Sequence, residues 1–183
     1  MKNTRSGRRD KKSSQYGWVA TVFCIAVTLS AVLSLASESL MAGAGVAVAL
    51  LILALFIGLG ILFDIIGVAV TAADEKPFHS MAAHREKGAR EALRLLKNAS
   101  RVSSVCNDVV GDICGIVSGT TAAVIVTQLQ RSLNTRTVLL SVGVTALISG
   151  LTIGGKALGK TFAIRKSTQV VFLAGRFLHL FHR

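Results

Sequence analysis

Four apolar runs, each long enough to cross a lipid bilayer, constrain this chain more than any other feature of its sequence. An α-helix rises about 1.5 Å per residue, so roughly 20 apolar residues span the ~30 Å hydrocarbon core. The runs lie at about residues 19–36, 43–70, 104–130 and 138–158. The ~10-residue alternating segments of a membrane β-barrel are not found in the sequence. The runs predict an all-α integral membrane protein with four transmembrane helices.

The basic residues predict how these helices are oriented. Residues 1–15 form a basic arm, and the segment 74–104 between the second and third runs carries more Lys and Arg than acids. Cytoplasmic segments are enriched in Lys and Arg, so both segments are expected inside, and only Arg131 and Arg136 fall outside. We therefore expect a multi-pass protein of the cell (plasma or inner) membrane with both termini in the cytoplasm.

The formal net charge of +12 raises the question of a nucleic-acid partner. The basic residues cluster at the ends of apolar runs and are not interleaved with aromatic residues. This distribution favours the lipid bilayer as the partner, with no nucleic acid. We find no nucleophile–base set and no phosphate-binding loop, so we do not expect an enzyme.

The chain divides into three expected parts. Residues 1–15 are predicted to be a disordered cytoplasmic arm, 16–41 an additional first transmembrane helix, and 42–183 the main transmembrane domain. A cleavable signal peptide is the competing interpretation of the first run. The second run would form a helix about 42 Å long, which must tilt or project into the cytoplasm. Asp64 would then lie in the inner half of the bilayer or at its interface.

Two segments outside the membrane have helical patterns. Residues 83–97 place Ala89, Ala92, Leu93 and Leu96 on one face, which predicts part of a cytoplasmic helical hairpin. The tail from Thr168 has apolar residues on one side, and it predicts a juxtamembrane amphipathic helix on the inner leaflet.

The third run contains polar groups that a simple membrane anchor does not need. Asp108 and Asp112 are four residues apart, so they share a helix face, with Asn107 and Gly111 beside them. A charged group near the bilayer centre costs at least ~2.5–3.5 kcal/mol, so such residues usually serve a function. Hydroxyl groups at Ser141, Thr145, Ser149 and Thr152 form a stripe on the fourth run, and glycine ridges on both runs predict close helix packing.

The three cysteines, Cys24, Cys106 and Cys114, all lie within predicted helices. They form neither a disulfide framework nor a Cys-x-x-Cys metal pattern, so they are predicted to be buried packing residues.

Residues of about 50–181 resemble the transmembrane domain of the CNNM/CorB/CorC family of magnesium transporters. The segment from Phe63 to Thr71 is similar to the family's Ser-x-x-Glu patch, and residues 87–98 to its cytoplasmic hairpin. Cys106-Asn107-Asp108 stands where the family has Gly-Asn-Asn, and residues 155–163 stand where it has Gly-Glu-x-x-Pro-Lys-x-x-Ala. The chain differs at family positions: Asp64 replaces a serine, Gly67 and Lys156 replace glutamates, and Gly159 replaces a proline.

The resemblance implies a divalent-cation transporter-like protein, with magnesium as the expected ion and a homodimer as the expected assembly. Magnesium prefers oxygen ligands, and the candidate ligands are Asp64, Thr71, Asn107, Asp108 and Asp112. The alternative is a transport-inactive relative that acts as a structural or regulatory membrane partner, with Lys156 in the ion site. The position of the Lys156 ammonium separates the two, and we expect it to extend to the inner headgroups, as lysines near helix ends usually do.

Overall fold

The computed structural model describes residues 6–41, 43–134 and 138–181, and the described residues are helices joined by short turns. The long helices are α1 (Ser6–Met41), α2 (Val46–Ala72), α6 (Asp112–Ser132) and α7 (Val138–Arg165). Three short helices, α3 (Lys76–Ala83), α4 (Ala89–Lys97) and α5 (Ala99–Ser104), connect α2 to the third span, and α8 (Ser167–Phe181) ends the described chain. A π-helical segment, η1 (Val105–Gly111), joins α5 to α6.

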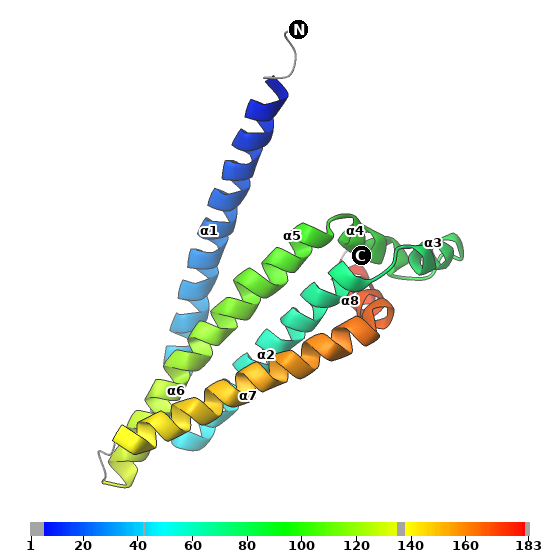
Figure 1. Ribbon diagram of the computed structural model, residues 1–183. Coiled ribbons are helices and arrows are strands. Elements are labelled where there is room, and N and C mark those ends of the chain that lie inside the picture. The colour runs from blue at the N-terminus through cyan, green and yellow to red at the C-terminus, as the bar shows by residue number, and fades with distance from the viewer. Residues whose placement is uncertain (1–5, 42, 135–137, 182–183) are drawn as a thin grey trace.

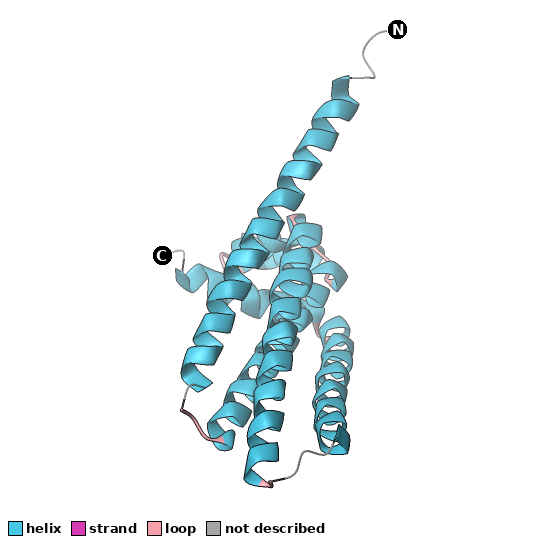
Figure 2. Cartoon of the chain, turned by 90° about the vertical axis from the view of Figure 1, so that its left-hand side faces the viewer, coloured by secondary structure: helices cyan, strands magenta, loops and turns pink. Residues whose placement is uncertain are grey.

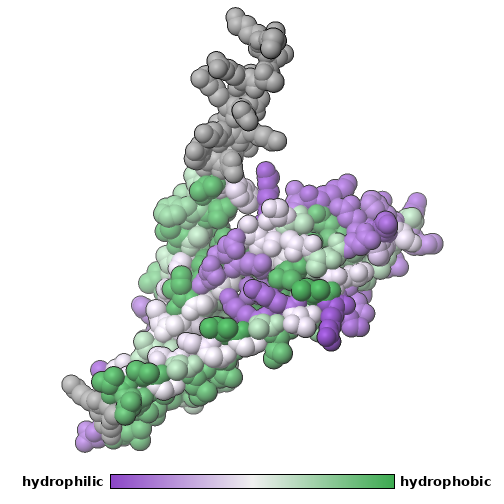
Figure 3. Space-filling model, in the orientation of Figure 1, coloured by the Kyte–Doolittle hydropathy of each residue, from purple (hydrophilic) through white to green (hydrophobic). Residues whose placement is uncertain are grey.

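Four helical stretches are long and apolar enough to cross a membrane: Gly17–Met41, Val46–Ala72, Ala99–Ser132 and Val138–Arg165. The predicted fold class is confirmed, because these stretches overlap the four apolar runs. The third stretch is continuous from α5 through η1 to α6, as Figure 1 shows. In Figure 3, hydrophobic residues cover the lower-left part of the molecule, and hydrophilic residues gather at the right, where α3, α4 and α8 lie.

Helix α2 is the centre of the bundle. It packs against α7, α6 and η1 and also meets α5 and α8 at its C-terminal end. Its residues are small or aliphatic almost throughout, and the buried ones include Ala49, Leu53, Phe56 and Val70. Asp64 is the one buried acid among the described residues. The fold therefore places this carboxylate in the interior of the bundle.

The segment between the second and third spans forms a helical hairpin, as predicted. Helices α3 and α4 are joined by a turn in which Arg85 and Gly88 have positive φ angles of 56° and 91°. The predicted face is also confirmed, since Ala89, Ala92 and Leu96 are buried and Leu93 packs against the same cluster. Whether this end is cytoplasmic stays a prediction.

Helix α8 differs from the expected surface helix, because one of its faces is covered by protein. Val171 is fully buried with Phe78 and Ala92 in a cluster that joins the hairpin to α2 and α8. Gly175 packs directly against the backbone of Gly88. Leu173, Phe177 and Leu180 remain exposed and form the apolar face left for a membrane.

Helix α1 begins at Ser6 within the described residues, and residues 1–5 lie outside them, so the basic cytoplasmic arm over residues 1–15 stays a prediction. The membrane-length part of α1 packs on α6 and η1, as Figure 2 shows from the side. Buried Ser37 lies 3.3 Å from Thr121 between the two hydroxyl oxygens, and the Arg101 guanidinium lies 5.0 Å from the centre of the Trp18 ring.

Candidate functional site

An ion pair joins α2 to α7 in the interior of the bundle. The Lys156 Nζ atom lies 3.5 Å from Asp64 Oδ2, and the side chains are 24% and 6% exposed. Lys156 also donates a 3.4 Å hydrogen bond to the Gly111 carbonyl oxygen at the end of η1. The ammonium is therefore held between three elements, and it neutralises the one buried acid among the described residues.

The expectation that Lys156 extends to the headgroups is wrong. Its side chain is directed into the bundle, because the glycines on either side of it in α7 leave it room to reach α2 and η1. Gly155 and Gly159 pack on Ile61 and Ile65 of α2 and bring the two backbones close together. At that separation a lysine can reach Asp64 on the facing helix.

Glycines on the facing helices make room for the polar side chains. A Cβ atom added at Gly111 would lie 2.7 Å from Asp64 Oδ1, so any larger residue would displace the carboxylate. A Cβ atom at Gly67 would overlap the side-chain amide of Asn107. Asp64 thus lies against Gly111, and Asn107 lies against Gly67 one helical turn further along α2. We call Asp64, Asn107 and Lys156, with Gly67 and Gly111, the central polar site.

Asn107 lies in the π-helical segment, and its amide is only partly satisfied. The Nδ2 group donates to Ser103 Oγ at 3.2 Å. The Oδ1 atom is buried and has no hydrogen-bond partner among the described residues. A buried acceptor without a donor is unfavourable, and π-helical segments recur at functional sites. This oxygen, which lies against Gly67, is therefore a buried acceptor of the central polar site that has no donor among the described residues.

The other predicted ligands lie away from this interior. Asp108 and Asp112 are both exposed and lie four residues apart, so they lie on an outer face of the third span. Asn107 is half-buried and Gly111 is buried, so these two positions lie toward the bundle interior. The predicted single polar face is therefore wrong, since the third span has two. Thr71 is exposed near the end of α2, and its hydroxyl donates to the Val68 carbonyl oxygen at 2.8 Å. Within the described ranges, no three His, Cys, Asp or Glu side chains are grouped where they could hold a metal ion.

Three of the four hydroxyl groups in the stripe of the fourth span donate hydrogen bonds within their own helix. Ser141, Thr145 and Thr152 donate to carbonyl oxygens of α7 at 2.8, 2.7 and 2.8 Å. Only some glycines of the two predicted ridges pack against other residues of this chain. Gly111, Gly155 and Gly159 meet neighbouring side chains, whereas Gly115, Gly119, Gly150 and Gly154 have no atom within 4 Å of an added Cβ.

Two of the cysteines behave as predicted. Cys106 and Cys114 are buried in η1 and α6, but Cys24 is exposed on α1, so the prediction of a buried thiol is wrong there.

A second ion pair, which the sequence reasoning missed, joins the hairpin to α8. The His179 Nδ1 atom lies 3.0 Å from Glu91 Oε1, and the two side chains are 44% and 16% exposed. The hydrogen bond from His179 lowers the pKa of Glu91 below its ordinary value of 4.5, while partial burial of the carboxyl group opposes that effect. Neither residue lies on the apolar face predicted for its helix, so the sequence pattern carried no signal for this pair.

Comparison with known proteins identifies the family. The model of the CNNM family, described as the cyclin M transmembrane N-terminal domain, matches residues 50–183. No curated protein and no solved structure matches the chain. The matched domain is a transporter domain rather than a catalytic one, and its family is associated with magnesium transport. Because the match covers α6, α7, α8 and the hairpin completely and α2 from Leu50 onward, this chain belongs to the CNNM transmembrane domain family.

Proposed function

We propose that this protein keeps the CNNM transmembrane architecture but closes its central polar site with Lys156, and that it acts as a structural or regulatory membrane partner. One observation carries the proposal: the Lys156 ammonium lies 3.5 Å from the carboxylate of Asp64, inside the bundle. Lys156 stands where the family motif has an acid, so a potential oxygen ligand is replaced by a fixed positive charge.

The chemistry of magnesium supports this assignment. Mg²⁺ requires near-octahedral oxygen ligands at about 2.0–2.1 Å and loses its water reluctantly. Asp64 already has a cationic partner, and an ammonium beside it repels a second cation. Asp108 and Asp112 are exposed on the outer face and do not add their charge to the interior. A dication would have to displace Lys156 before it could bind Asp64.

Magnesium transport is the second candidate, and two details favour it. The contacts of Lys156 are long, at 3.5 Å and 3.4 Å, and the Asn107 Oδ1 atom has no donor among the described residues. In this alternative Mg²⁺ is the substrate, and Asp64 and Asn107 are its ligands in the interior, whereas the other candidate ligands, Thr71, Asp108 and Asp112, are exposed. Lys156 would leave the carboxylate when the ion enters.

Magnesium uptake into proteoliposomes separates the two candidates. If Lys156 closes the site, vesicles with wild-type protein take up no more Mg²⁺ than vesicles without protein. Transport would instead give uptake that Asp64→Asn abolishes. Asp74→Ala is the matched control, because Asp74 is an exposed acid beyond the end of α2 and should leave any uptake unchanged.

Assembly and orientation are part of the same proposal. We infer a homodimer from the family, and we place both termini in the cytoplasm because the basic segments lie at one end of the spans. A cysteine introduced at Ser39 should react with an impermeant reagent added outside, and one at Ser80 only after the membrane is opened. The Cys24→Ala background avoids labelling of the one exposed native thiol among the described residues. Reaction at Ser80 in intact cells would contradict the orientation.

A further inference from the structure

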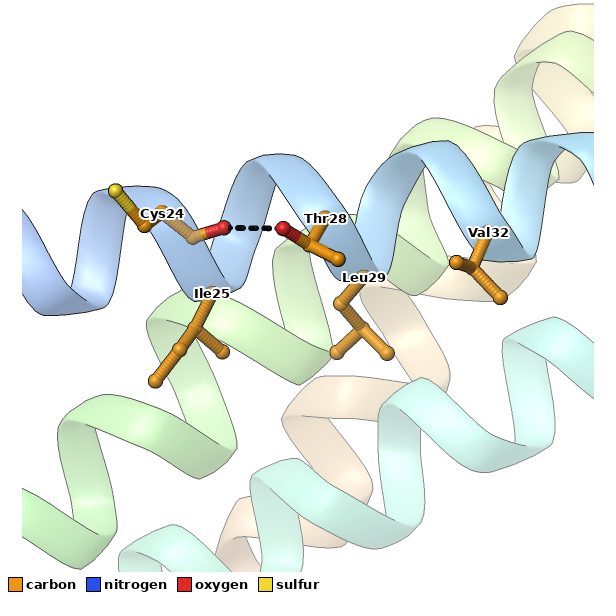
Figure 4. Close-up of a pocket in the computed structure, with 5 residues that line it drawn as sticks. All are labelled: Cys24, Ile25, Thr28, Leu29 and Val32. Atoms are coloured by element: carbon orange, nitrogen blue, oxygen red, sulfur yellow. Dashed lines mark hydrogen bonds between the residues drawn. The ribbon is translucent and has the colours of Figure 1, made fainter.

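A cavity of 350 Å³ lies between the turn of the hairpin and the end of α8. Its walls come from α3, from the turn between α3 and α4, from α4 and from α8. It differs in this respect from the hollow that Figure 4 shows, whose lining residues all belong to one helix, α1. Pockets that bind small molecules have volumes of about 300–1,000 Å³, so the cavity at the hairpin is large enough for one.

Three cationic side chains line the cavity, those of Arg85, Lys87 and Arg90. All three residues are exposed. Within the part of the chain that the structure describes, none of these side chains makes an ion pair or a hydrogen bond. Their charges are therefore available to a ligand.

Two acids also line the cavity, Glu86 and Glu91. The Glu91 carboxylate is already occupied, because its Oε1 atom lies 3.0 Å from His179 Nδ1. Glu86 is exposed, where water and salt screen its charge. The cationic side chains outnumber the two acids, so the cavity favours an anion.

The backbone of the turn is fixed, which holds these charges in place. Arg85 and Gly88 have positive φ angles, and Gly175 of α8 packs directly against the backbone of Gly88. The backbone N–H groups of Lys87 and Gly88 donate to no acceptor among the described residues. Gly88 is buried, and a buried N–H group without an acceptor is unfavourable. The turn therefore offers further hydrogen-bond donors beside the three cationic side chains.

The cavity also lies beside the apolar face of α8 that is left for a membrane. It is outside the four membrane-length stretches, at the end of the molecule where α3, α4 and α8 lie in Figure 1. His179, which lines the cavity, stands between Leu178 and Leu180, and both leucines are exposed. Basic pockets at the membrane surface bind the headgroups of anionic lipids. A lipid headgroup and a soluble ligand can therefore both reach this cavity.

We propose that this cavity binds a phosphate group, carried either by a lipid headgroup or by a soluble phosphate compound. Arginine presents a planar fork of N–H donors that pairs with two phosphate oxygens, and lysine adds a compact positive charge. Arg85 and Arg90 hold the phosphate oxygens, and Lys87 contributes its charge. The site is formed by the hairpin and α8, so it is independent of the Asp64–Lys156 pair and of what the central polar site carries.

Calorimetric titration of the protein in neutral detergent micelles tests the proposal and identifies the source of the phosphate. The two probes are inorganic phosphate and short-chain phosphatidic acid, and short-chain phosphatidylcholine is the zwitterionic control. We expect saturable binding of one phosphatidic acid per chain, tighter than that of inorganic phosphate, because its acyl chains contact the apolar face of α8. Equal affinity for the two probes would assign the site to a soluble phosphate compound.

Two results of these titrations would overturn the proposal. One is the absence of saturable binding for both probes. The other is binding of phosphatidylcholine as tight as that of phosphatidic acid, which would show that the acyl chains alone are recognised.

A pair of arginine variants tests whether the cavity itself recognises the phosphate. Arg90→Gln removes one cation from the lining and should weaken the binding of phosphatidic acid about tenfold, the effect of losing one hydrogen bond to a charged group. Arg94→Gln removes the same charge one turn further along α4, at an exposed residue outside the lining, and should leave the affinity unchanged. Equal weakening in the two variants would show general surface charge only and would overturn the site.

A pair of alanine variants tests the location without changing any charge. Ala82→Gln adds a side chain within the lining of the cavity and should weaken binding. Ala83→Gln adds the same side chain at the next residue of α3, which is exposed and outside the lining, and should bind as the wild type does. Equal affinity in the two variants would overturn the cavity as the location of the site.

Discussion

The Asp64–Lys156 and Glu91–His179 pairs both join helices that are far apart in the sequence, but they lie in different surroundings. The first connects α2 to α7 in the bundle interior, and the second connects α4 to α8 outside the membrane-length helices. Asp64 is only 6% exposed, whereas His179 is 44% exposed. Water can replace a lost partner at the second pair but not at the first. Loss of one partner should therefore destabilise the protein more at the Asp64–Lys156 pair than at the Glu91–His179 pair.

The packing around the two pairs differs as well. In the interior, small residues open space for polar groups, as Gly111 does for Asp64. At the hairpin, Gly88 and Gly175 instead bring two backbones into direct contact, and the cluster of Phe78 and Val171 lies beside them. The hairpin–α8 contact therefore depends mainly on close packing, and the interior contact depends mainly on charge. Substitutions that remove a charge should therefore affect stability most in the interior, and substitutions that disturb packing should affect it most at the hairpin.

The largest effect is expected for Lys156→Ala. Removing the ammonium leaves the Asp64 carboxylate buried without a partner, which costs about 3–5 kcal/mol in known buried pairs. The free energy of unfolding in detergent micelles, measured without metal, should fall by that amount. Lys160→Ala, at an exposed lysine one turn further along α7, is the control and should change stability little. An equal loss of stability in Lys156→Ala and Lys160→Ala would contradict the claim that the buried pair stabilises the bundle more than an exposed lysine does.

An intermediate effect is expected for Gly88→Ala. Gly88 has a φ angle of 91°, and an added Cβ would lie 2.6 Å from the Arg176 backbone nitrogen. A non-glycine residue in such a conformation costs about 1–3 kcal/mol, so the melting temperature should fall although both charges of the nearby pair remain. Gly119→Ala, where an added Cβ meets no atom within 4 Å, is the matched control. A Gly88→Ala protein as stable as the wild type would contradict the packing argument.

The smallest effect is expected for Glu91→Gln. A partly exposed ion pair contributes about 0.2–1 kcal/mol, so the loss of stability at neutral pH should be small. Because the pKa of Glu91 is lower in the folded protein, its contribution is present above the ordinary value of 4.5 and disappears as the pH falls through the folded value. Wild type and variant should therefore differ in melting temperature at neutral pH and converge well below pH 4.5. A difference that persists in acid would exclude the carboxylate as its cause.

The membrane architecture could be predicted from the sequence because it depends on the length of apolar runs. The hairpin face could also be predicted, since Ala89, Ala92 and Leu96 follow the helical period. These are local patterns, and the residues that carry them lie within one segment.

The interior contacts could not be predicted, because each depends on which residues face one another across helices. A glycine at position 111 does not by itself indicate a carboxylate on α2. Only the close packing of Gly155 and Gly159 against α2 explains why Lys156 turns inward. The inward turn of Asn107 depends on the π-helical segment, which the 3.6-residue period does not indicate. The covered face of α8 likewise depends on Gly175 meeting Gly88.

A double-mutant cycle between Asp64 and Lys156 tests most directly the claim that the lysine is held by this carboxylate. The free energy of unfolding is measured without metal for the wild type, Asp64→Asn, Lys156→Met and the double variant. We expect each single variant to be strongly destabilised and the double variant to recover much of the loss, because a buried pair replaced by neutral groups leaves no unpaired charge. The coupling energy should exceed about 2 kcal/mol, within the range for residues in direct contact. Additive losses, with a coupling energy near zero, would show that Lys156 does not close the site.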